Sequence, residues 1–157
     1  MVHEYAIALG SNRPHGRHGG PEQVLRAAIR ELNALGRVER ISRIHRTAAL
    51  GPAGRSFANA AILLSSDLDP PTLLAALKSI ERSFGRRAGK RWGPRVLDLD
   101  IILWSGGRFA ARGLDIPHKQ LTCRRFVLAP LAEIAPGHII PRTGHNVRHA
   151  AHRLGRG

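Results

Sequence analysis

The chain has 157 residues, enough for one domain spanning residues 1–157 with a substantial buried core. Its 25 Lys and Arg residues outnumber its 11 Asp and Glu residues, and the formal charge of +14 favours partners that carry phosphates or other anions. The single cysteine, Cys123, excludes an internal disulfide and a paired-thiol metal site, and no apolar run is long enough for a membrane span. We therefore expect a cytoplasmic protein that does not associate with a membrane.

The first two thirds of the chain predict four strands and two helices. A short apolar run over residues 4–10 predicts the first strand, and the segment from Pro21 to Gly36 has the apolar spacing of a helix. Residues 38–47 and 57–66 are predicted as strands on either side of a loop. A second amphipathic helix is predicted from the Asp-Pro-Pro sequence at 69–71 to Gly85, and a fourth strand follows it.

This order, βαββαβ, predicts an α+β fold, a ferredoxin-like sandwich in which two helices cover one face of an antiparallel sheet. The remaining residues predict a turn at Gly106 and Gly107 and additional C-terminal helices over 124–136 and 146–157.

The strand VLDLDIIL carries two aspartates, Asp98 and Asp100, on the same face of an extended backbone as Ile102. Its other face is expected to carry four apolar side chains: Leu97, Leu99, Ile101 and Leu103. Aspartate is depleted in strands and the rest of the segment is apolar, so we expect a central strand. A carboxylate pair suits Mg²⁺, a hard cation held by one or two carboxylates together with substrate phosphates. A solvated strand face is the alternative interpretation.

The loop GRRAGKRWGPR, residues 85–95, places several cations beside this pair. A positive loop next to two carboxylates fits phosphoryl transfer, which depends on positioning and charge neutralisation, although a solvated basic run is the alternative. The sequence contains neither a P-loop pattern nor the protein-kinase motifs, and its nine histidines include no H-E-x-x-H pair, so a zinc site is not expected.

Five segments spanning nearly the whole chain carry distinctive motifs: IALGSN (7–12), RTAALGPAGRSFANAA (46–61), RWGPRVLDLDII (91–102), IPH (116–118) and RRFVLAPLAEIAP (124–136). In type and order they resemble the 6-hydroxymethyl-7,8-dihydropterin pyrophosphokinases of folate biosynthesis, and RWGPRxLDLDI is highly specific. The resemblance implies Mg-dependent transfer of pyrophosphate from ATP to the hydroxymethyl group of the pterin, which gives AMP and the pterin diphosphate.

The resemblance also implies roles for residues around the transferring phosphates. Asp98 and Asp100 correspond to the ligands of two Mg²⁺ ions, and Arg86 and Arg95 to arginines that bind the phosphates during catalysis. The remaining residues that it implies in ATP binding are Trp92, on a loop that closes over the site, Ile101, His118 and Arg124.

For the pterin, Phe57 and Phe126 resemble the two rings that stack on the flat bicycle, and Asn59 resembles the amide that binds its edge. Thr47 and Leu50 lie in the segment that lines the same pocket. Taken singly, each Phe would be interpreted as a core residue, and only the joint pattern favours a binding role.

Two other functions compete with this reading. An RNA-binding module has the same βαββαβ order and would explain the charge, but it needs aromatic residues patterned along its central strands. The chain has only four Phe, two Trp and one Tyr, and no strand carries that pattern. A catalytically impaired relative that only binds pterin or nucleotide is the second alternative. We expect a monomer whose partners are ATP and the pterin, with no nucleic acid.

Overall fold

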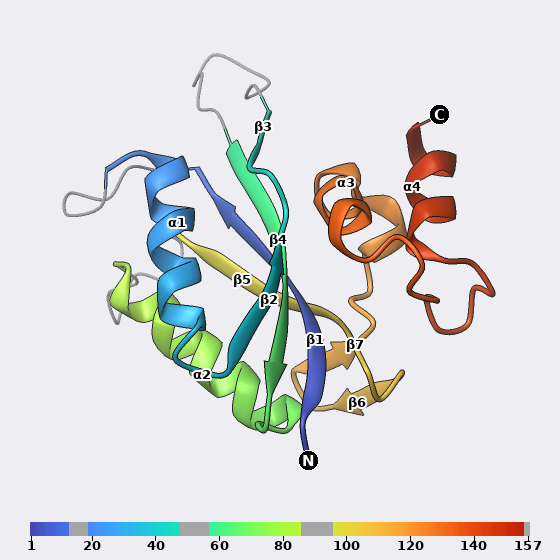
Figure 1. The fold of residues 1–157 in the computed structure, drawn as a ribbon, viewed down its shortest axis with the longest axis horizontal. Helices are drawn as coiled ribbons and strands as arrows, with labels where there is room; N and C mark the ends of the chain where they lie inside the picture. The colour runs from blue at the N-terminus through green and yellow to red at the C-terminus, as the bar shows by residue number, and fades with distance from the viewer. Residues whose placement is uncertain (13–18, 48–56, 86–95, 156–157) are drawn as a thin grey trace.

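The computed structural model describes residues 1–12, 19–47, 57–85 and 96–155 (Figure 1). Within these ranges the main sheet is antiparallel, with the order β2-β4-β1-β5, and β3 pairs with the beginning of β4. Its strands are β1 (His3–Ser11), β2 (Arg37–Ile41), β3 (His45–Thr47), β4 (Phe57–Ser66) and β5 (Asp98–Trp104). The single strand predicted over residues 38–47 is therefore divided into β2 and β3, both of which pair with β4.

Two helices, α1 (Pro21–Leu32) and α2 (Pro70–Ser83), cover one face of this sheet and confirm the two predicted helices. Both begin with proline, whose fixed φ suits the first helical turn. Asp69 caps α2, since its Oδ1 accepts a hydrogen bond from Thr72 N at 2.9 Å. Leu25 of α1 and Leu77 of α2 are fully buried against the sheet in one apolar core.

On the opposite face of the sheet lies α3 (Arg125–Ile134), and α4 (Val147–Gly155) packs beside α3, as Figure 1 shows. A second apolar core fills this side, where Leu128 of α3 and Val147 of α4 pack with Ile102 of β5. The expected C-terminal helices and the α+β class are thus confirmed, and the sheet lies between two helical layers. Of the described helices, none combines the length and apolar composition needed to cross a membrane.

Three short elements between β5 and α3 were not predicted. A small hairpin is formed by β6 (Phe109–Ala111) and β7 (Leu114–Ile116), and a 3₁₀ turn follows at η1 (Leu121–Cys123). Three residues are too few for a periodic apolar pattern, so the sequence gives no strong signal for them. Together they carry the chain from the end of β5 to the start of α3.

Two expectations about β5 were wrong. The strand lies at an edge of the sheet, next to β1, rather than in its centre. An irregularity in its pairing with β1, between Ala6 and Ile7, also interrupts the alternation of side chains. Ile102 and Leu103 consequently both face the second core, whereas Leu103 was expected on the face of Ile101.

Candidate active site

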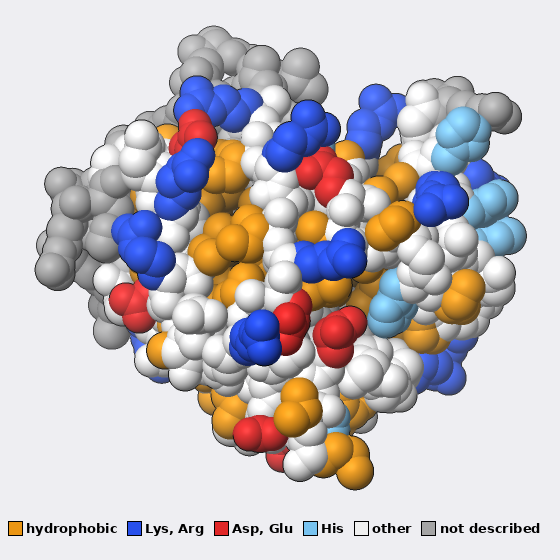
Figure 2. Space-filling model, viewed as in Figure 1, with side chains coloured by type: hydrophobic (Ala, Val, Ile, Leu, Met, Phe, Trp, Pro, Cys, Tyr) orange, Lys and Arg blue, Asp and Glu red, His pale blue; other side chains and the backbone are white. Residues whose placement is uncertain are grey.

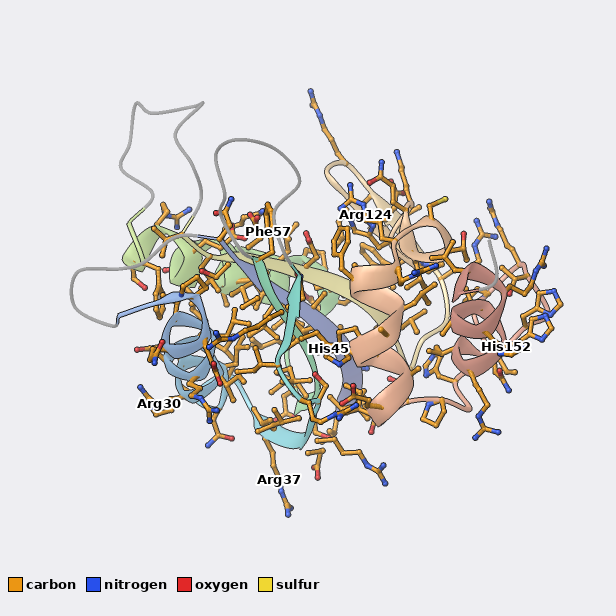
Figure 3. All side chains as sticks on the ribbon, turned by 90° about the horizontal axis from the view of Figure 1, so that it is seen from above. Arg30, Arg37, His45, Phe57, Arg124 and His152 are labelled. Atoms are coloured by element: carbon orange, nitrogen blue, oxygen red, sulfur yellow. The ribbon has the colours of Figure 1, made fainter. Side chains whose placement is uncertain are left out.

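A cleft of about 480 Å³ lies on the α3 side of the sheet. In its lining Ala8 of β1 has a small side chain and Gly10 has none, which leaves room above the sheet. A Cβ atom on Gly10 would lie 3.2 Å from the Asn59 Oδ1, so the glycine allows the amide to approach the backbone closely. Figure 3 shows Phe57 and Arg124, two further lining residues, at the same end of the molecule.

A transverse row of residues connects the sides of this cleft across four strands. In it His45 of β3 pairs with Asn59 of β4, Asn59 pairs with Gly10 of β1, and Gly10 pairs with Asp98 of β5. Directly opposed residues in antiparallel strands present their side chains on the same face. The strand register therefore places the predicted amide and the first predicted carboxylate on one face, separated only by a glycine.

Asp98 and Asp100 both line the cleft, two residues apart on β5 and half-buried. They face Gly10 and Ala8 across the pairing with β1, so no bulky neighbour separates them from the open volume. Among the described residues, no group of three or more His, Cys, Asp or Glu side chains is arranged as a metal site. A cation bound here would therefore take further oxygen ligands from a substrate or from water, as Mg²⁺ does.

Glu81 of α2 supports this strand, a role that the sequence analysis missed. Its carboxylate is buried, and its Oε2 accepts a hydrogen bond from Leu99 N at 2.8 Å, between the two aspartates. Its Oε1 lies 3.3 Å from Lys78 Nζ. A signal was present, because Glu81 follows Leu77 by four residues and so lies on the apolar stripe of the helix, where a carboxylate needs a specific partner.

His118 and Arg124 line the cleft beyond the end of β5. His118 N donates a hydrogen bond to Ile102 O at 3.0 Å, which fixes the residue beside the strand that carries the aspartates. His118 Nδ1 accepts from Gln120 N at 3.2 Å, so in the neutral ring Nε2 carries the proton and is a donor for a ligand. The Arg124 guanidinium lies 5.6 Å from the centre of the Phe126 ring, within the range of a cation–π contact.

Phe57, at the start of β4, and Phe126, in the first turn of α3, line the cleft from the sheet and from the helix. Their exposed fractions are 43% and 45%, high for side chains of this size. Asn59, two residues after Phe57 on the same face of β4, also lines the cleft and is buried. Two exposed rings beside a buried amide can bind a flat heterocycle that carries hydrogen-bonding groups on its edge.

The other predicted residues are not brought to the cleft or cannot be placed in it. Ile101 is buried in the core under α1 and α2, and its neighbour Ile102 lines the cleft instead. Thr47 pairs with Phe57 through its backbone in β3, and its side chain is not described. The remaining predicted residues lie outside the described ranges: Leu50, Arg86, Trp92 and Arg95.

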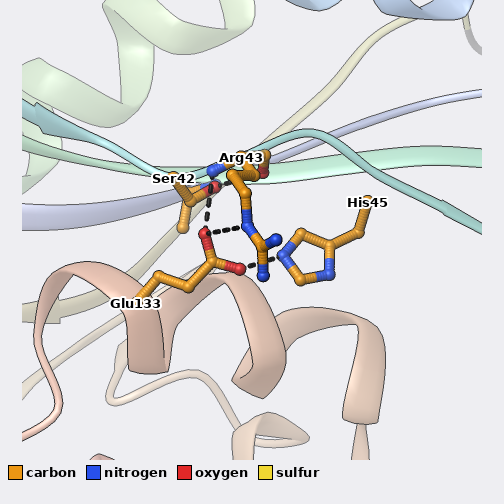
Figure 4. A network of polar contacts seen from close by, with 5 residues as sticks. Ser42, Arg43, His45 and Glu133 are labelled. Carbon is orange, nitrogen blue, oxygen red and sulfur yellow. Dashed lines mark hydrogen bonds and ion pairs between the residues drawn. The ribbon is translucent and has the colours of Figure 1, made fainter.

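A polar network joins α3 to the segment between β2 and β3, next to the cleft (Figure 4). Glu133 of α3 accepts a hydrogen bond from Arg43 N at 2.9 Å and a second one from His45 Nε2, and it lies 3.5 Å from Arg43 Nε. Burial raises the pKa of Glu133, but the Arg43 N–H and the charges of His45 and Arg43 outweigh it and hold the pKa below its ordinary value. Glu133 is therefore ionised at neutral pH.

Two comparisons with known proteins identify the family of this chain, and a third supports its fold. Residues 6–136 match the family model described as 7,8-dihydro-6-hydroxymethylpterin-pyrophosphokinase. A 2-amino-4-hydroxy-6-hydroxymethyldihydropteridine pyrophosphokinase of Synechocystis is 43% identical over 149 residues, which are 94% of this chain and 74% of that protein. The protein of the same name from Methylorubrum extorquens is 36% identical to this chain, and the match covers 91% of that protein.

Among solved structures, the wild-type HPPK-DHPS of Plasmodium falciparum superposes with a TM-score of 0.76 over 98% of this chain at 13% identity. This chain spans only 41% of that protein's length. At this identity the superposition supports the fold alone.

Proposed function

The chain belongs to the 7,8-dihydro-6-hydroxymethylpterin-pyrophosphokinase family, and from that premise we propose which residues of the cleft carry out each part of the reaction. The enzyme transfers pyrophosphate from ATP to 6-hydroxymethyl-7,8-dihydropterin in folate biosynthesis, giving AMP and the pterin diphosphate. The alternative functions, an RNA-binding module and a catalytically impaired relative, are not needed to explain the cleft.

Asp98 and Asp100 are the proposed metal ligands. Their carboxylates share one face of β5, are half-buried and line the cleft, which fits the oxygen ligands and the open coordination positions that Mg²⁺ requires. Two Mg²⁺ ions held there would neutralise the phosphate charge and stabilise the entering and leaving oxygens of an in-line displacement. Glu81 keeps both carboxylates in place, because it fixes the backbone N–H of the residue between them.

We assign the phosphates of ATP to the side of the cleft next to the metal ligands. There His118 Nε2 and the Arg124 guanidinium are available to donate hydrogen bonds to phosphate oxygens. From the family pattern we keep Arg86 and Arg95 as catalytic phosphate ligands and Trp92 as the residue that closes over ATP. The backbone of Ile101, whose side chain is in the core, can still contribute to the ATP site.

The pterin is assigned to the side lined by Phe57 and Phe126. Its two faces would stack on these rings, and its edge would bind the buried amide of Asn59, with Thr47 and Leu50 closing the same pocket. This assignment places the hydroxymethyl group toward Asp98, which lies beyond Asn59 and Gly10 in the transverse row across the sheet.

The observation that carries the proposal is the convergence, in one cleft, of a carboxylate pair, a cationic side and two exposed aromatic rings from β5, α3 and β4. The test is a product assay with ATP and 6-hydroxymethyl-7,8-dihydropterin in Mg²⁺. We expect AMP and the pterin diphosphate in equal amounts, and AMP only when the pterin is present. Formation of ADP, or AMP release that does not depend on the pterin, would contradict the assignment.

We also propose that the fold is ferredoxin-like and forms a single domain that acts as a monomer in the cytoplasm. The strand order and the placement of α1 and α2 on one face of the sheet support the fold assignment. The monomeric state is a prediction from the sequence alone. Light scattering after size-exclusion chromatography tests that state directly.

A further inference from the structure

Glu133 anchors α3 at the opposite end of the helix from Phe126. The two residues are seven positions apart, two helical turns, so they share one face of α3 and are separated by roughly 10 Å along its axis. Glu133 contacts Arg43 N at 2.9 Å and the ring of His45. Its carboxylate is thus the polar contact that ties this face of α3 to the chain between β2 and β3 (Figure 4).

The anchored segment is itself fixed to the strand that carries the pterin residues. Ser42 N donates to Ala61 O at 2.9 Å, and Ala61 N donates to Ser42 Oγ at 2.9 Å, which holds the segment on β4. His45 then pairs with Asn59 of β4. A displacement of His45 or Arg43 relative to Glu133 would therefore change the position of α3 relative to β4.

From this arrangement we propose that Glu133 is a positioning residue for pterin recognition, which acts through His45 and the Arg43 N–H to set the spacing between Phe57 and Phe126. The inference rests on the proposed assignment of the pterin to these two rings. Stacking on both faces of a flat ligand requires the two rings at a fixed separation, so a small shift of α3 weakens both contacts at once. On the phosphate side of the cleft, Asp98, Asp100 and His118 depend on β5 and on the turn after it, which Glu133 does not contact in the described structure. Arg124 caps the far end of α3 and would move with the helix, so ATP should be affected, but less than the pterin.

The first experiment compares Glu133→Ala with Glu22→Gln. Glu22 is a matched control, because it pairs with Arg46, the neighbour of His45 on β3, from the α1 side. We expect Glu133→Ala to raise KM for the pterin on the order of tenfold, equivalent to about 1.4 kcal/mol, while KM for ATP rises clearly less and kcat changes by less than about twofold. Glu22→Gln should leave all three near the parental values.

Two further variants keep the test decisive if Glu133→Ala does not fold. Glu133→Gln retains an oxygen for the Arg43 N–H but loses the charge next to His45, and His45→Ala leaves the Arg43 contact in place. Each variant should raise KM for the pterin more than KM for ATP, as Glu133→Ala does, but by a smaller factor. Equal effects on pterin and ATP, accompanied by a loss of stability, would show that Glu133 only stabilises the fold, and unchanged kinetics would overturn the proposal outright.

A double-mutant cycle separates this inference from the proposed function. Pterin affinity is measured with a non-hydrolysable ATP analogue for Phe126→Ala, Glu133→Ala and the double variant. If Glu133 acts by placing Phe126, the second substitution should cost little once the ring is absent. Additive losses would refute the positioning role and leave the pterin site intact. Parental pterin affinity in Phe126→Ala would instead refute the assignment of the ring itself, and the positioning role with it.

Discussion

At the scale of single residues, the two most informative side chains are Phe57 and Phe126. A folded chain with four Phe residues leaves two of them more than two fifths exposed, and both line the same cleft. Exposed apolar surface of this kind marks a binding site more often than a packing defect. The sequence favoured this role only through the joint family pattern, because each Phe alone would have been interpreted as a core residue.

Replacing Phe126 by Ala should weaken pterin binding by about 1 kcal/mol or more and should change binding of an ATP analogue far less, since the lost ring stacks only on the heterocycle. Calorimetric titration of each ligand measures both effects. Ile139→Ala is the control, because Ile139 is 58% exposed and lies outside the cleft. Equal losses for both ligands would identify Phe126 as a structural residue.

At the scale of elements, the position of β5 is the main lesson. An edge strand with exposed backbone groups is a site for unwanted pairing, and here α2 covers it while Glu81 accepts the hydrogen bond of Leu99. The expectation of a central strand was wrong because an apolar sequence indicates only that a strand is buried, not where it lies in the sheet. A helix can bury a strand as completely as a neighbouring strand does. The buried fractions of Leu99 and Leu103 at this edge show that it does.

Removing this support should be costly. Glu81→Ala leaves the buried Leu99 N–H without its carboxylate acceptor, and we expect the free energy of unfolding in urea to fall by about 1–3 kcal/mol. Glu81→Gln keeps an oxygen that can accept the bond and should lose less. Parental stability in Glu81→Ala, or identical losses in the two variants, would show that the hydrogen bond to Leu99 does not hold the strand.

Sequence reasoning located the long periodic elements and half of the described residues that line the cleft. Helices α1 and α2 and strand β4 each carry an apolar pattern over ten or more residues, which local sequence is sufficient to reveal. The support residues were missed because their roles depend on contacts between distant positions. Glu81 lies 18 residues from Leu99, and Glu133 lies 90 residues from Arg43.

At the scale of the whole molecule, one sheet separates two apolar cores, and the cleft opens where the second core ends. The basic side chains of the visible face, unlike the apolar core residues, do not gather in one or two clusters. Figure 2 shows Lys and Arg side chains spread over the visible face rather than gathered in one patch. The basic residues of this face therefore do not by themselves mark an anion site, and the anion selectivity of the enzyme has to come from placed residues such as His118 and Arg124.

Global stability should depend on Tyr5 at alkaline pH. Its hydroxyl donates to Leu68 O at 2.6 Å, and burial, followed by the charge of Asp69, raises the pKa of Tyr5 to about 12. The folded state thus favours the protonated phenol, so its contribution is complete below pH 10 and is lost as pH rises toward 12. Tyr5→Phe should be less stable than the parent at pH 8, and the difference should shrink at pH 11.

Urea unfolding at the two pH values measures this difference. Tyr5 is the only tyrosine of the chain, so phenolate absorbance during a pH titration reports its ionisation without interference from a second tyrosine. A stability difference that is the same at pH 8 and pH 11, or ionisation near pH 10 in the folded protein, would contradict the role assigned to its burial.

The most direct test of the central claim is AMP production across a Mg²⁺ titration in Asp98→Asn and Asp100→Asn, with Asp115→Asn as the control outside the active-site cleft. Each cleft variant keeps the shape of the side chain and removes one charge. We expect both to fold, to melt without metal at no lower temperature than the parent because the repulsion within the pair is relieved, and to lose pyrophosphoryl transfer by orders of magnitude. Asp115→Asn should retain parental turnover. Near-parental AMP production in both cleft variants would contradict the assignment of Asp98 and Asp100 and the catalytic account built on them.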